Sequence, residues 1–577
     1  MKKILLFALL MLPLWSNAQE QISVTNDAAG NLAKLLPDSM RLTVAELKVA
    51  GPLNGADLKV LQQMANRSKT KLPTERLLRS IDLTESRIVE GKEGMKTRAD
   101  EMPSRLFSGA KGLEKALLPA LIVNVSSGAF NGCEALREVT IPQSVSVIDD
   151  GAFANCKALA EVQLPDGLVK IGESAFEGCE ALTSVQIPAS VTTLGDKMLR
   201  NCKSLSKAVI EAKAQQMGVA AFQNCESLTS VILPDGLQTI GAEAFGKCPQ
   251  LSSISLPASV TVLGPGAFSQ CQSLASATLP NVEKLGSRAF EKCESLREIT
   301  LPATLVSMGN SVFEDCRSLE TVQIEGNIKD VPSNAFENCA SLQSITLPAS
   351  VVTLGGDAFK GCASLAEIQL PQTLKKIGSE AFKGCLALTE IVLPNSVTSI
   401  GSHAFEDCKS MVKADVQGFI KEIENDLFAG CGSLSELLLP NSIERIESDA
   451  FRDCVSLTRF IVPMAVKSIG NGAFRNCSML ATVDLSNSLK KIGSNAFAKC
   501  VMLQEVYSFA AQPPKIEKNT FKDVPTTMMQ IFVPRGCKTI YNLDKVWSRY
   551  SSIIEMSIAD MKERRGIKSK DTKKKDE

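Results

Sequence analysis

Histidine is almost absent from this sequence, and its scarcity removes a large class of chemistry. The 577 residues contain one histidine, His403, so the chain can form neither a histidine-rich metal site nor a pair of catalytic histidines. A strong charge of one sign is also lacking, because 63 basic residues balance 63 acidic ones. Nucleic-acid binding relies on a basic field, so we expect no nucleic-acid partner.

Aromatic side chains and long apolar runs are scarce as well. Aromatic residues make up 5% of the chain, and 23 of them are Phe, against three Tyr and two Trp. Sugar sites usually stack the sugar on an aromatic ring, so this scarcity argues against a glycan-binding module. The apolar run at the start, Ile4 to Trp15, is too short to span a bilayer, which needs about 20 residues.

The start of the chain has the parts of a secretory signal peptide. Lys2 and Lys3 supply positive charge, the apolar run follows, and Ser16-Asn17-Ala18 supplies the small residues for cleavage. We therefore predict a signal peptide over residues 1–18 and an exported chain without an integral membrane span. Its expected location is the cell surface, the medium or the periplasm.

A cysteine returns every 23 residues through most of the chain. Seventeen cysteines follow this spacing from Cys133 to Cys500, with a single gap of 22. A Phe stands three residues before each of them, with one exception. Flanking copies keep the Phe but place Ala110 and Val524 in the cysteine position. This regularity predicts a solenoid of about nineteen ~23-residue coils over residues 101–525.

Within one coil, the apolar pattern predicts a short strand and a tight turn. Ile345 and Leu347 are spaced by two, the period of a strand with one buried face, and Pro348 ends that strand because proline cannot donate a ladder hydrogen bond. The Ala-Phe-x-x-Cys run is too short for a stable helix and suits one tight helical turn. Gly355 permits a turn that a side chain would obstruct. The predicted core residues of this stretch are Phe336, Cys339, Leu342, Ile345, Leu347, Phe359 and Cys362.

The column of cysteines leaves three interpretations open: small apolar core groups, disulfides between neighbouring coils, and metal ligands. The core interpretation is favoured, because the column has an odd number of members and its outer copies are Ala110 and Val524. In-register side chains on adjacent strands also point in parallel about 4.8 Å apart, whereas disulfide Cβ atoms prefer about 3.8 Å. Cys537 is outside the register and is the candidate for an accessible thiol.

The segment LTEIVLPNSVTSIGSHAFEDC (388–408) contains the full repeat motif, and it resembles the BspA-like (Treponema-type) leucine-rich repeats of Bacteroidota surface proteins. The resemblance extends over most of the chain. It implies a β-rich, right-handed leucine-rich repeat solenoid that is capped at both ends, with a short parallel strand in each coil. It also implies a non-enzymatic surface protein that adheres to host matrix or to other cells.

Residues 19–100 lack the cysteine motif and are predicted to form an N-terminal cap. Apolar residues at helical spacing predict a short helix over 54–65, and an alternating pattern predicts a degenerate first strand within 78–89. A cap is needed because the first coil of a solenoid otherwise exposes its core.

The C-terminal end is predicted to form a second cap, followed by a charged tail. Residues 526–556 hold Tyr541, Trp547 and Tyr550, and these aromatic groups suit the sealing of the last coil. Residues 557–577 mix charges of both signs and are predicted to be a solvated tail.

No catalytic residue, metal ligand or cofactor site is predicted. His403 occupies a polar turn position that holds Glu380, Glu243 or Arg288 in other coils, so it is interpreted as a solvent-facing substitution. Carboxylates recur with the repeat, and no Gly-rich phosphate loop is found. A catalytic site should interrupt the repeat locally, so we expect a protein that is not an enzyme.

The outward-facing strand residues are the candidate binding surface, because they alternate with the buried ones. Most are polar, but the column turns apolar toward the C-terminal end, and contiguous apolar groups on an exposed face often bind partners. Some coils lack the strand-ending proline, and we predict that they mark irregularities in this surface. The residues that replace the proline are Glu211, Glu325, Gln417 and Ser486. The candidate binding residues are Glu298, Thr300, Thr321, Gln323, Ser344, Thr346, Glu367, Gln369, Glu390, Val392, Glu436, Leu438, Arg459 and Ile461.

These observations predict an exported, non-enzymatic solenoid that binds an extracellular protein or a cell-surface ligand. Two alternatives stay open. One is a structural scaffold of the periplasm or envelope with no external partner, and the other is a glycan-binding module.

Overall fold

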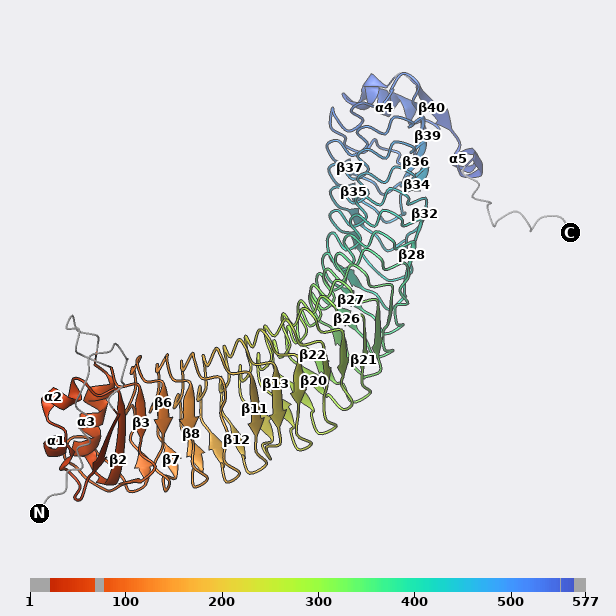
Figure 1. Ribbon diagram of the computed structural model, residues 1–577. Helices are drawn as coiled ribbons and strands as arrows, with labels where there is room; N and C mark the ends of the chain where they lie inside the picture. Colours follow the sequence, from red (N-terminus) through yellow and green to blue (C-terminus); the bar gives the residue numbers. More distant parts are fainter. Residues whose placement is uncertain (1–20, 68–76, 551, 565–577) are drawn as a thin grey trace, which may run out of the picture. The chain divides into compact units, whose positions relative to one another are not determined.

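The computed structural model describes residues 21–67, 77–550 and 552–564, and the chain forms two compact units that divide at strand β13 (Lys207–Ile210). Short parallel strands, joined by turns, are the main regular structure of both units (Figure 1). The predicted β-rich leucine-rich repeat solenoid is therefore confirmed as the fold class. The predicted signal peptide lies outside the described residues.

In the first unit, one parallel sheet has the strand order β1-β2-β3-β6-β8, with β4 paired to β2, and a second has the order β12-β10-β9-β7-β5. Three short helices precede most of these strands in the chain. The strands are β1 (Gln21–Thr25), β2 (Glu46–Leu53), β3 (Ser80–Asp82), β4 (Ser86–Ile88), β5 (Glu101–Met102), β6 (Lys115–Leu117), β7 (Asn124–Val125), β8 (Glu138–Thr140), β9 (Val147–Ile148), β10 (Lys170–Ile171), β11 (Ser184–Ile187) and β12 (Thr193–Leu194). The helices are α1 (Leu32–Leu35), α2 (Asp38–Arg41) and α3 (Gly55–Ala65).

The N-terminal segment contains the expected helix but begins its strands earlier than expected. Helix α3 starts at a capping box, in which the Asn54 side chain accepts hydrogen bonds from the first turn and Asp57 accepts one from the Asn54 N–H. The predicted first strand is in fact preceded by two others, because β1 pairs with β2 and β2 pairs with β3. The parallel ladder therefore starts at Gln21, and the sequence did not reveal it because the cysteine motif is absent there.

In the second unit, most coils contribute to two ladders, where the sequence predicted only one strand. The strands of the first ladder are longer and mostly follow the cysteines. The strands of the second ladder have two residues each and precede the position at which a glycine recurs in many coils, such as Gly355. The first ladder contains β15 (Ser230–Ile232), β17 (Ser253–Ser255), β19 (Ser276–Thr278), β21 (Glu298–Leu301), β23 (Thr321–Ile324), β25 (Ser344–Thr346), β28 (Glu390–Leu393), β30 (Lys413–Val416), β32 (Glu436–Leu438), β34 (Arg459–Ile461), β36 (Thr482–Leu485), β38 (Glu505–Ser508), β39 (Gln530–Pro534) and β40 (Ser552–Met556). The second ladder contains β14 (Gln216–Met217), β16 (Thr239–Ile240), β18 (Val262–Leu263), β20 (Lys284–Leu285), β22 (Ser307–Met308), β24 (Asp330–Val331), β26 (Thr353–Leu354), β27 (Lys376–Ile377), β29 (Ser399–Ile400), β31 (Glu422–Ile423), β33 (Arg445–Ile446), β35 (Ser468–Ile469) and β37 (Lys491–Ile492).

The core consists of stacked copies of the same residues. Adjacent coils pair in a register of 23, so Thr321 lies beside Ser344 and each Phe lies on the next Phe. The Phe336 ring centroid is 5.4 Å from both Phe313 and Phe359, with nearly parallel planes. Six of the seven predicted core residues of this stretch are buried. The exception is Leu347, which is half-buried because β25 ends one residue before it.

The cysteines are core residues, and every one of them is a reduced thiol. The Cys339 Sγ–H donates a hydrogen bond to the backbone oxygen of Phe313 in the preceding coil, at 3.1 Å, and the Cys362 thiol does the same to Phe336 at 3.2 Å. Burial raises the pKa of the Cys179 thiol to about 12. The core interpretation is confirmed, and the thiol adds a hydrogen bond that the sequence did not suggest.

The turn before each cysteine is tight but is not a continuous helix. The Cys339 N–H donates to the Phe336 oxygen three residues earlier, whereas the Phe336 N–H donates to Ala358 in the next coil. Asn334 and Asn338 interrupt the turn with φ values of 59° each. Gly355 is required by close approach, since a Cβ there would lie 2.4 Å from the Ser333 nitrogen.

The coils without the strand-ending proline organise the first ladder, contrary to the prediction that they disturb it. The Glu325 N–H donates to the Leu301 oxygen at 2.9 Å, and the Gln417 N–H donates to the Leu393 oxygen at 3.0 Å. Proline cannot make this bond. As a result β23 and β30 are the central strands of two three-stranded sheets, β21-β23-β25 and β28-β30-β32. The next sheet begins at β34, so β32 and β34 are both edge strands.

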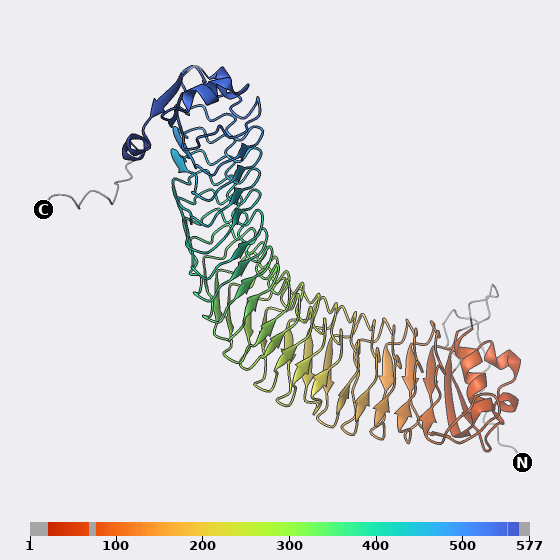
Figure 2. The same cartoon turned by 180° about the vertical axis from the view of Figure 1, so that it is seen from behind.

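The C-terminal end closes with aromatic groups and a returning helix. Helices α4 (Lys538–Leu543) and η1 (Trp547–Arg549) bury Tyr541 and Trp547, whose polar atoms donate to the backbone oxygens of Ala510 and Pro514. Helix α5 (Ile558–Arg564) lies near the last strands, as the view from behind also shows (Figure 2).

The segment predicted to be a solvated tail, residues 557–577, begins with helix α5, whose described side chains are exposed apart from Met561. Its Met561 is fully buried against Tyr507 and Phe532, two outward-facing residues of β38 and β39. Polar residues surround Met561 in the sequence, so one apolar residue gave too little signal to predict the contact. The remainder of that segment lies outside the described residues.

Candidate binding surface

All fourteen predicted binding residues are exposed, and we call the outward side chains of the first ladder in the second unit the exposed strand face. Six of the fourteen lie together on the sheet β21-β23-β25 and four on the sheet β28-β30-β32. Arg459 and Ile461 lie on β34, while Glu367 and Gln369 lie in a coil that has no strand in the first ladder.

Sequence reasoning left out several outward residues of this face, among them Lys413, Asp415 and Ile232. Lys413 and Asp415 lie on β30, between the predicted residues of β28 and β32. Ile232 on β15 is 53% exposed. Its signal was available, since an apolar residue occupies an outward position there just as at Val392.

The sheet β21-β23-β25 presents a flat polar surface. Its outward residues in one column are Glu298, Thr321 and Ser344, which pair directly across adjacent strands. The Gln323 amide donates to the Glu325 carboxylate at 3.1 Å, so part of this polarity is satisfied within the sheet. A surface of this kind offers hydrogen bonds but no apolar anchor.

A groove of about 320 Å³ lies between the edge strands β32 and β34. Leu438 and Ile461, 55% and 47% exposed, are on its rim. Two features explain the opening. Pro463 follows β34 and cannot donate to the β32 coil. In addition, Phe460 takes an inward position that holds Leu437 in the preceding coil, and its ring centroid lies 4.5 Å from Phe474 in the core.

Charged groups flank the groove. Arg459 contributes to its wall and makes an ion pair with Asp484 at 3.4 Å, and Asp484 is fully buried although it occupies an outward position of β36. From β38 onward the outward residues Tyr507 and Phe532 are buried beneath α5. The accessible part of the exposed strand face therefore ends near β34 and β36.

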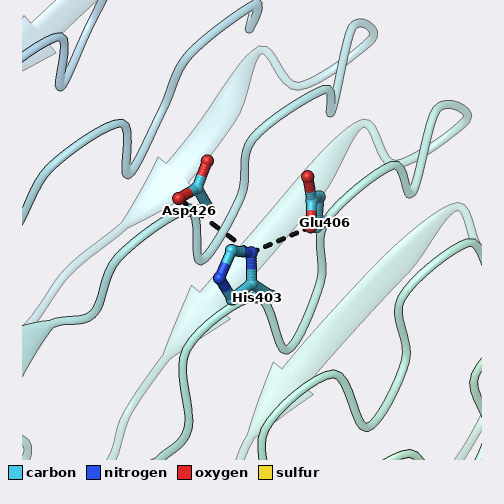
Figure 3. Close-up of side chains that lie close together, drawn as sticks. All are labelled: His403, Glu406 and Asp426. Carbon is cyan, nitrogen blue, oxygen red and sulfur yellow. Dashed lines mark hydrogen bonds and ion pairs between the residues drawn. The ribbon is translucent and has the colours of Figure 1, made fainter.

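The single histidine lies on another side of the coils and is not a plain solvent-facing substitution. His403 Nδ1 is 2.9 Å from Glu406 Oε2 and 3.9 Å from Asp426 Oδ2, as Figure 3 shows. Its side chain is 36% exposed, whereas those of Glu406 and Asp426 are 14% and 19% exposed. The sequence analysis missed this cluster, although Asp426 is 23 residues after His403 and therefore occupies the same position in the next coil.

In the part of the chain that the structure describes, none of the helices has the length and apolarity to cross a membrane.

Comparison with known proteins identifies the repeat. The family model of the BspA type leucine rich repeat region matches residues 100–229, 215–342, 329–458 and 444–551, well over half of the chain. No curated protein matches the chain.

Several solved structures are similar to this chain. A leucine-rich repeat protein from Bacteroides ovatus is 26% identical, with 72% of this chain and 84% of that chain covered and a TM-score of 0.34. A leucine rich cell surface protein from Faecalibacterium prausnitzii is 29% identical, with 59% and 82% covered and a TM-score of 0.36. The leucine rich repeat protein of T. pallidum is 27% identical, with 42% and 82% covered and a TM-score of 0.25. On the extent of the family match, this chain belongs to the BspA-type leucine-rich repeat family.

Proposed function

We propose that this chain is exported and binds an extracellular protein, without catalysis, through the exposed strand face of its second unit. The groove between β32 and β34 is the observation that carries the proposal, because its rim holds Leu438 and Ile461 in solvent on a largely polar face. Exposed apolar groups beside a depression mark interaction sites, and a few such anchors supply most of the binding energy of a protein interface.

The size of the groove favours a protein side chain as its occupant. About 320 Å³ is at the lower end of the volumes of small-molecule pockets, and it accommodates one or two large apolar side chains of a partner. Glu436 and Arg459 next to the groove supply a polar rim, as protein interfaces usually have around an apolar centre.

The chain itself contains a contact of the kind that we propose. Helix α5 places Met561 against Tyr507 and Phe532, which occupy the same outward column as Leu438 and Ile461. A short segment with one long apolar side chain is therefore sufficient to cover this column. We infer that the partner presents a comparable segment, and that adhesion to host matrix or to other cells is the use of such binding.

Export is supported by the first residues of the chain. Lys2 and Lys3, the apolar run to Trp15 and the small residues up to Ala18 together form the pattern of a secretory signal. A non-enzymatic role is supported by the repetition of the carboxylates with the coil and by the family to which the chain belongs.

Replacement of Ile461 by Glu tests the groove. The purified chain without residues 1–18 is measured by surface plasmon resonance against a panel of matrix proteins and whole-cell surfaces. We expect at least one saturable interaction, weakened about 30-fold or more by Ile461→Glu, because a hot-spot residue contributes about 2 kcal/mol or more. Val306→Glu is the matched control, since Val306 is 58% exposed but lies outside the exposed strand face, and it should leave the affinity unchanged.

Cell fractionation separates this function from that of an internal scaffold. Intact cells treated with a protease should lose the protein from their surface, or the protein should appear in the medium. Protection inside the envelope would contradict external binding and favour the scaffold. Equal weakening by Ile461→Glu and Val306→Glu would show that the groove is not the anchor.

A further inference from the structure

The histidine stands in a column of acidic residues. The position two residues before each Phe lies at the surface of the turn, and its side chains recur every 23 residues. In four neighbouring coils of the second unit this position is acidic, at Asp357, Glu380, Asp426 and Asp449. The coil between Glu380 and Asp426 carries His403 instead.

An adjacent column is basic, and it too is reversed in the His403 coil. The position after the Phe holds Lys360, Lys383, Arg452 and Arg475 in four coils of the second unit, and Ala429 in the coil of Asp426. In the His403 coil the same position holds Glu406. The His403 coil therefore has a base where its neighbours have an acid, and an acid where several of them have a base. As a result Glu406 Oε2 lies near His403 Nδ1 within the coil, and Asp426 Oδ2 approaches the same nitrogen from the next coil.

The side chains of the three residues lie together, with both carboxylates beside His403 Nδ1 (Figure 3). His403 Nδ1, Glu406 Oε2 and Asp426 Oδ2 all lie within 4.8 Å of one another. Ligand atoms about 2.0–2.2 Å from a tetrahedral ion lie about 3.3–3.6 Å apart. The distances from His403 Nδ1 to the two oxygens, 2.9 and 3.9 Å, fall on either side of that spacing.

Arg452 fixes the two carboxylates from their other sides. Its Nη2 lies 3.0 Å from Asp426 Oδ1 and 3.5 Å from Glu406 Oε1, so the Oδ2 and Oε2 atoms are left toward the histidine. Hydrogen bonds of this kind to the outer atoms of ligating side chains are typical of metal sites, where they orient the ligands.

Lys383 would compete with a metal ion for Glu406. Its Nζ lies 2.8 Å from Glu406 Oε2, which an ion would also contact. Lys383 has a second partner, Glu380 Oε2, at 3.6 Å, so it can leave Glu406 without losing all of its ion pairs.

We propose that His403, Glu406 and Asp426 bind a divalent transition-metal ion, with Zn²⁺ as the reference ion. One imidazole and two carboxylates suit Zn²⁺, Co²⁺ or Mn²⁺ better than Ca²⁺, which prefers oxygen ligands alone and more of them. Water completes the coordination, because the histidine side chain is 36% exposed. The ion joins two adjacent coils, so its binding stabilises the stack locally.

Isothermal titration of the full chain with Zn²⁺ tests the proposal. The Cys537→Ser variant is the background, because Cys537 is the partly exposed thiol and thiolates bind Zn²⁺. We expect one saturable site, weakened about tenfold or more by His403→Asn and by Glu406→Gln. Asn accepts the left-handed backbone of this position, where φ is 61°, so His403→Asn should fold normally. Asp357→Asn, in the same column two coils away, should leave the affinity unchanged.

A spectroscopic readout separates ligation from a merely structural role. The chain contains a single imidazole, so Cu²⁺ bound at this site should give electron paramagnetic resonance couplings to one imidazole nitrogen. His403→Asn should abolish these couplings. Saturable Zn²⁺ binding that is equal in the background and in His403→Asn would overturn the proposal, as would the lack of saturable binding in a folded chain.

Discussion

At the scale of single residues, the cysteine column shows how a side chain can serve a core and a backbone at once. Each Phe oxygen in the turn accepts the N–H of the cysteine three residues later, and the thiol of the next coil donates to the same oxygen. Ala and Val fill comparable volume but cannot donate. Ala110 suits the start of the column, because the residue 26 positions before it is Thr84 and no Phe turn precedes it there.

Thiol reactivity provides a direct test of this column. The seventeen repeat cysteines are buried and out of reach of a reagent, and burial raises the pKa of thiols such as those of Cys179 and Cys500, whereas Cys537 is partly exposed. We expect Ellman's reagent to label about one thiol per native chain at pH 8 and all eighteen in denaturant without reductant. A raised pKa means that a thiol ionises only at higher pH. A change from pH 7 to pH 9 should therefore not make the seventeen buried thiols react with the reagent. Cys537→Ser should remove the native signal, and few thiols in the denatured chain would contradict the reduced column.

At the scale of elements, one backbone donor decides whether neighbouring strands join. Residues such as Gln417 supply an N–H where most coils have proline, and these coils become central strands. Pro440 and Pro463 follow the successive strands β32 and β34, which do not pair, and the groove lies between them. A proline after each strand is not sufficient for this, because β17 and β19 pair although Pro257 and Pro280 follow them. The sequence displayed these prolines, but their effect depends on two coils together, and so a coil-by-coil interpretation predicted the reverse.

The variant Pro463→Gln should close the groove. The new N–H would be placed to donate to the Leu439 oxygen, by analogy with the bond from Gln417 to Leu393. One such bond contributes about 1 kcal/mol, so amide hydrogen exchange in β34 should slow about fivefold. Partner binding should weaken in parallel. Pro440→Gln is the control, because it faces β30, with which β32 already pairs. Unchanged exchange in Pro463→Gln would show that the proline does not cause the opening.

At the scale of the whole molecule, the extent of sequence prediction follows the repeat. The 23-residue period predicted the solenoid, the Phe and Cys core and the exposure of the strand face, because each copy repeats the same alternation. Features that join distant or unlike segments were missed. These are the strands that begin at Gln21, the cluster of His403 with Asp426 from the next coil, and the return of α5 onto β38 and β39. The repeat period predicts the contacts that all copies share, but it does not predict a contact that occurs only once in the chain.

The return of α5 can be tested by Met561→Asp. A charge at this fully buried position cannot be solvated, so the helix should leave the face at a cost of about 3 kcal/mol and expose Tyr507 and Phe532. We expect stronger fluorescence of an apolar dye and faster tryptic cleavage after Lys562. Glu563→Ala, at an exposed position of α5, should change neither. Equal cleavage of Met561→Asp and the parent chain would contradict the docked helix.

The thiol ladder also has a consequence for how the chain must mature. Seventeen reduced cysteines become safe from oxidants only when the neighbouring coils have closed over them. In the proposed exported chain, coil formation therefore competes with disulfide formation, and any pause that leaves two thiols uncovered invites a wrong cross-link. Stacked copies are close in sequence, which favours rapid packing of each coil onto the previous one. Rapid packing would bury the thiols before they can oxidise.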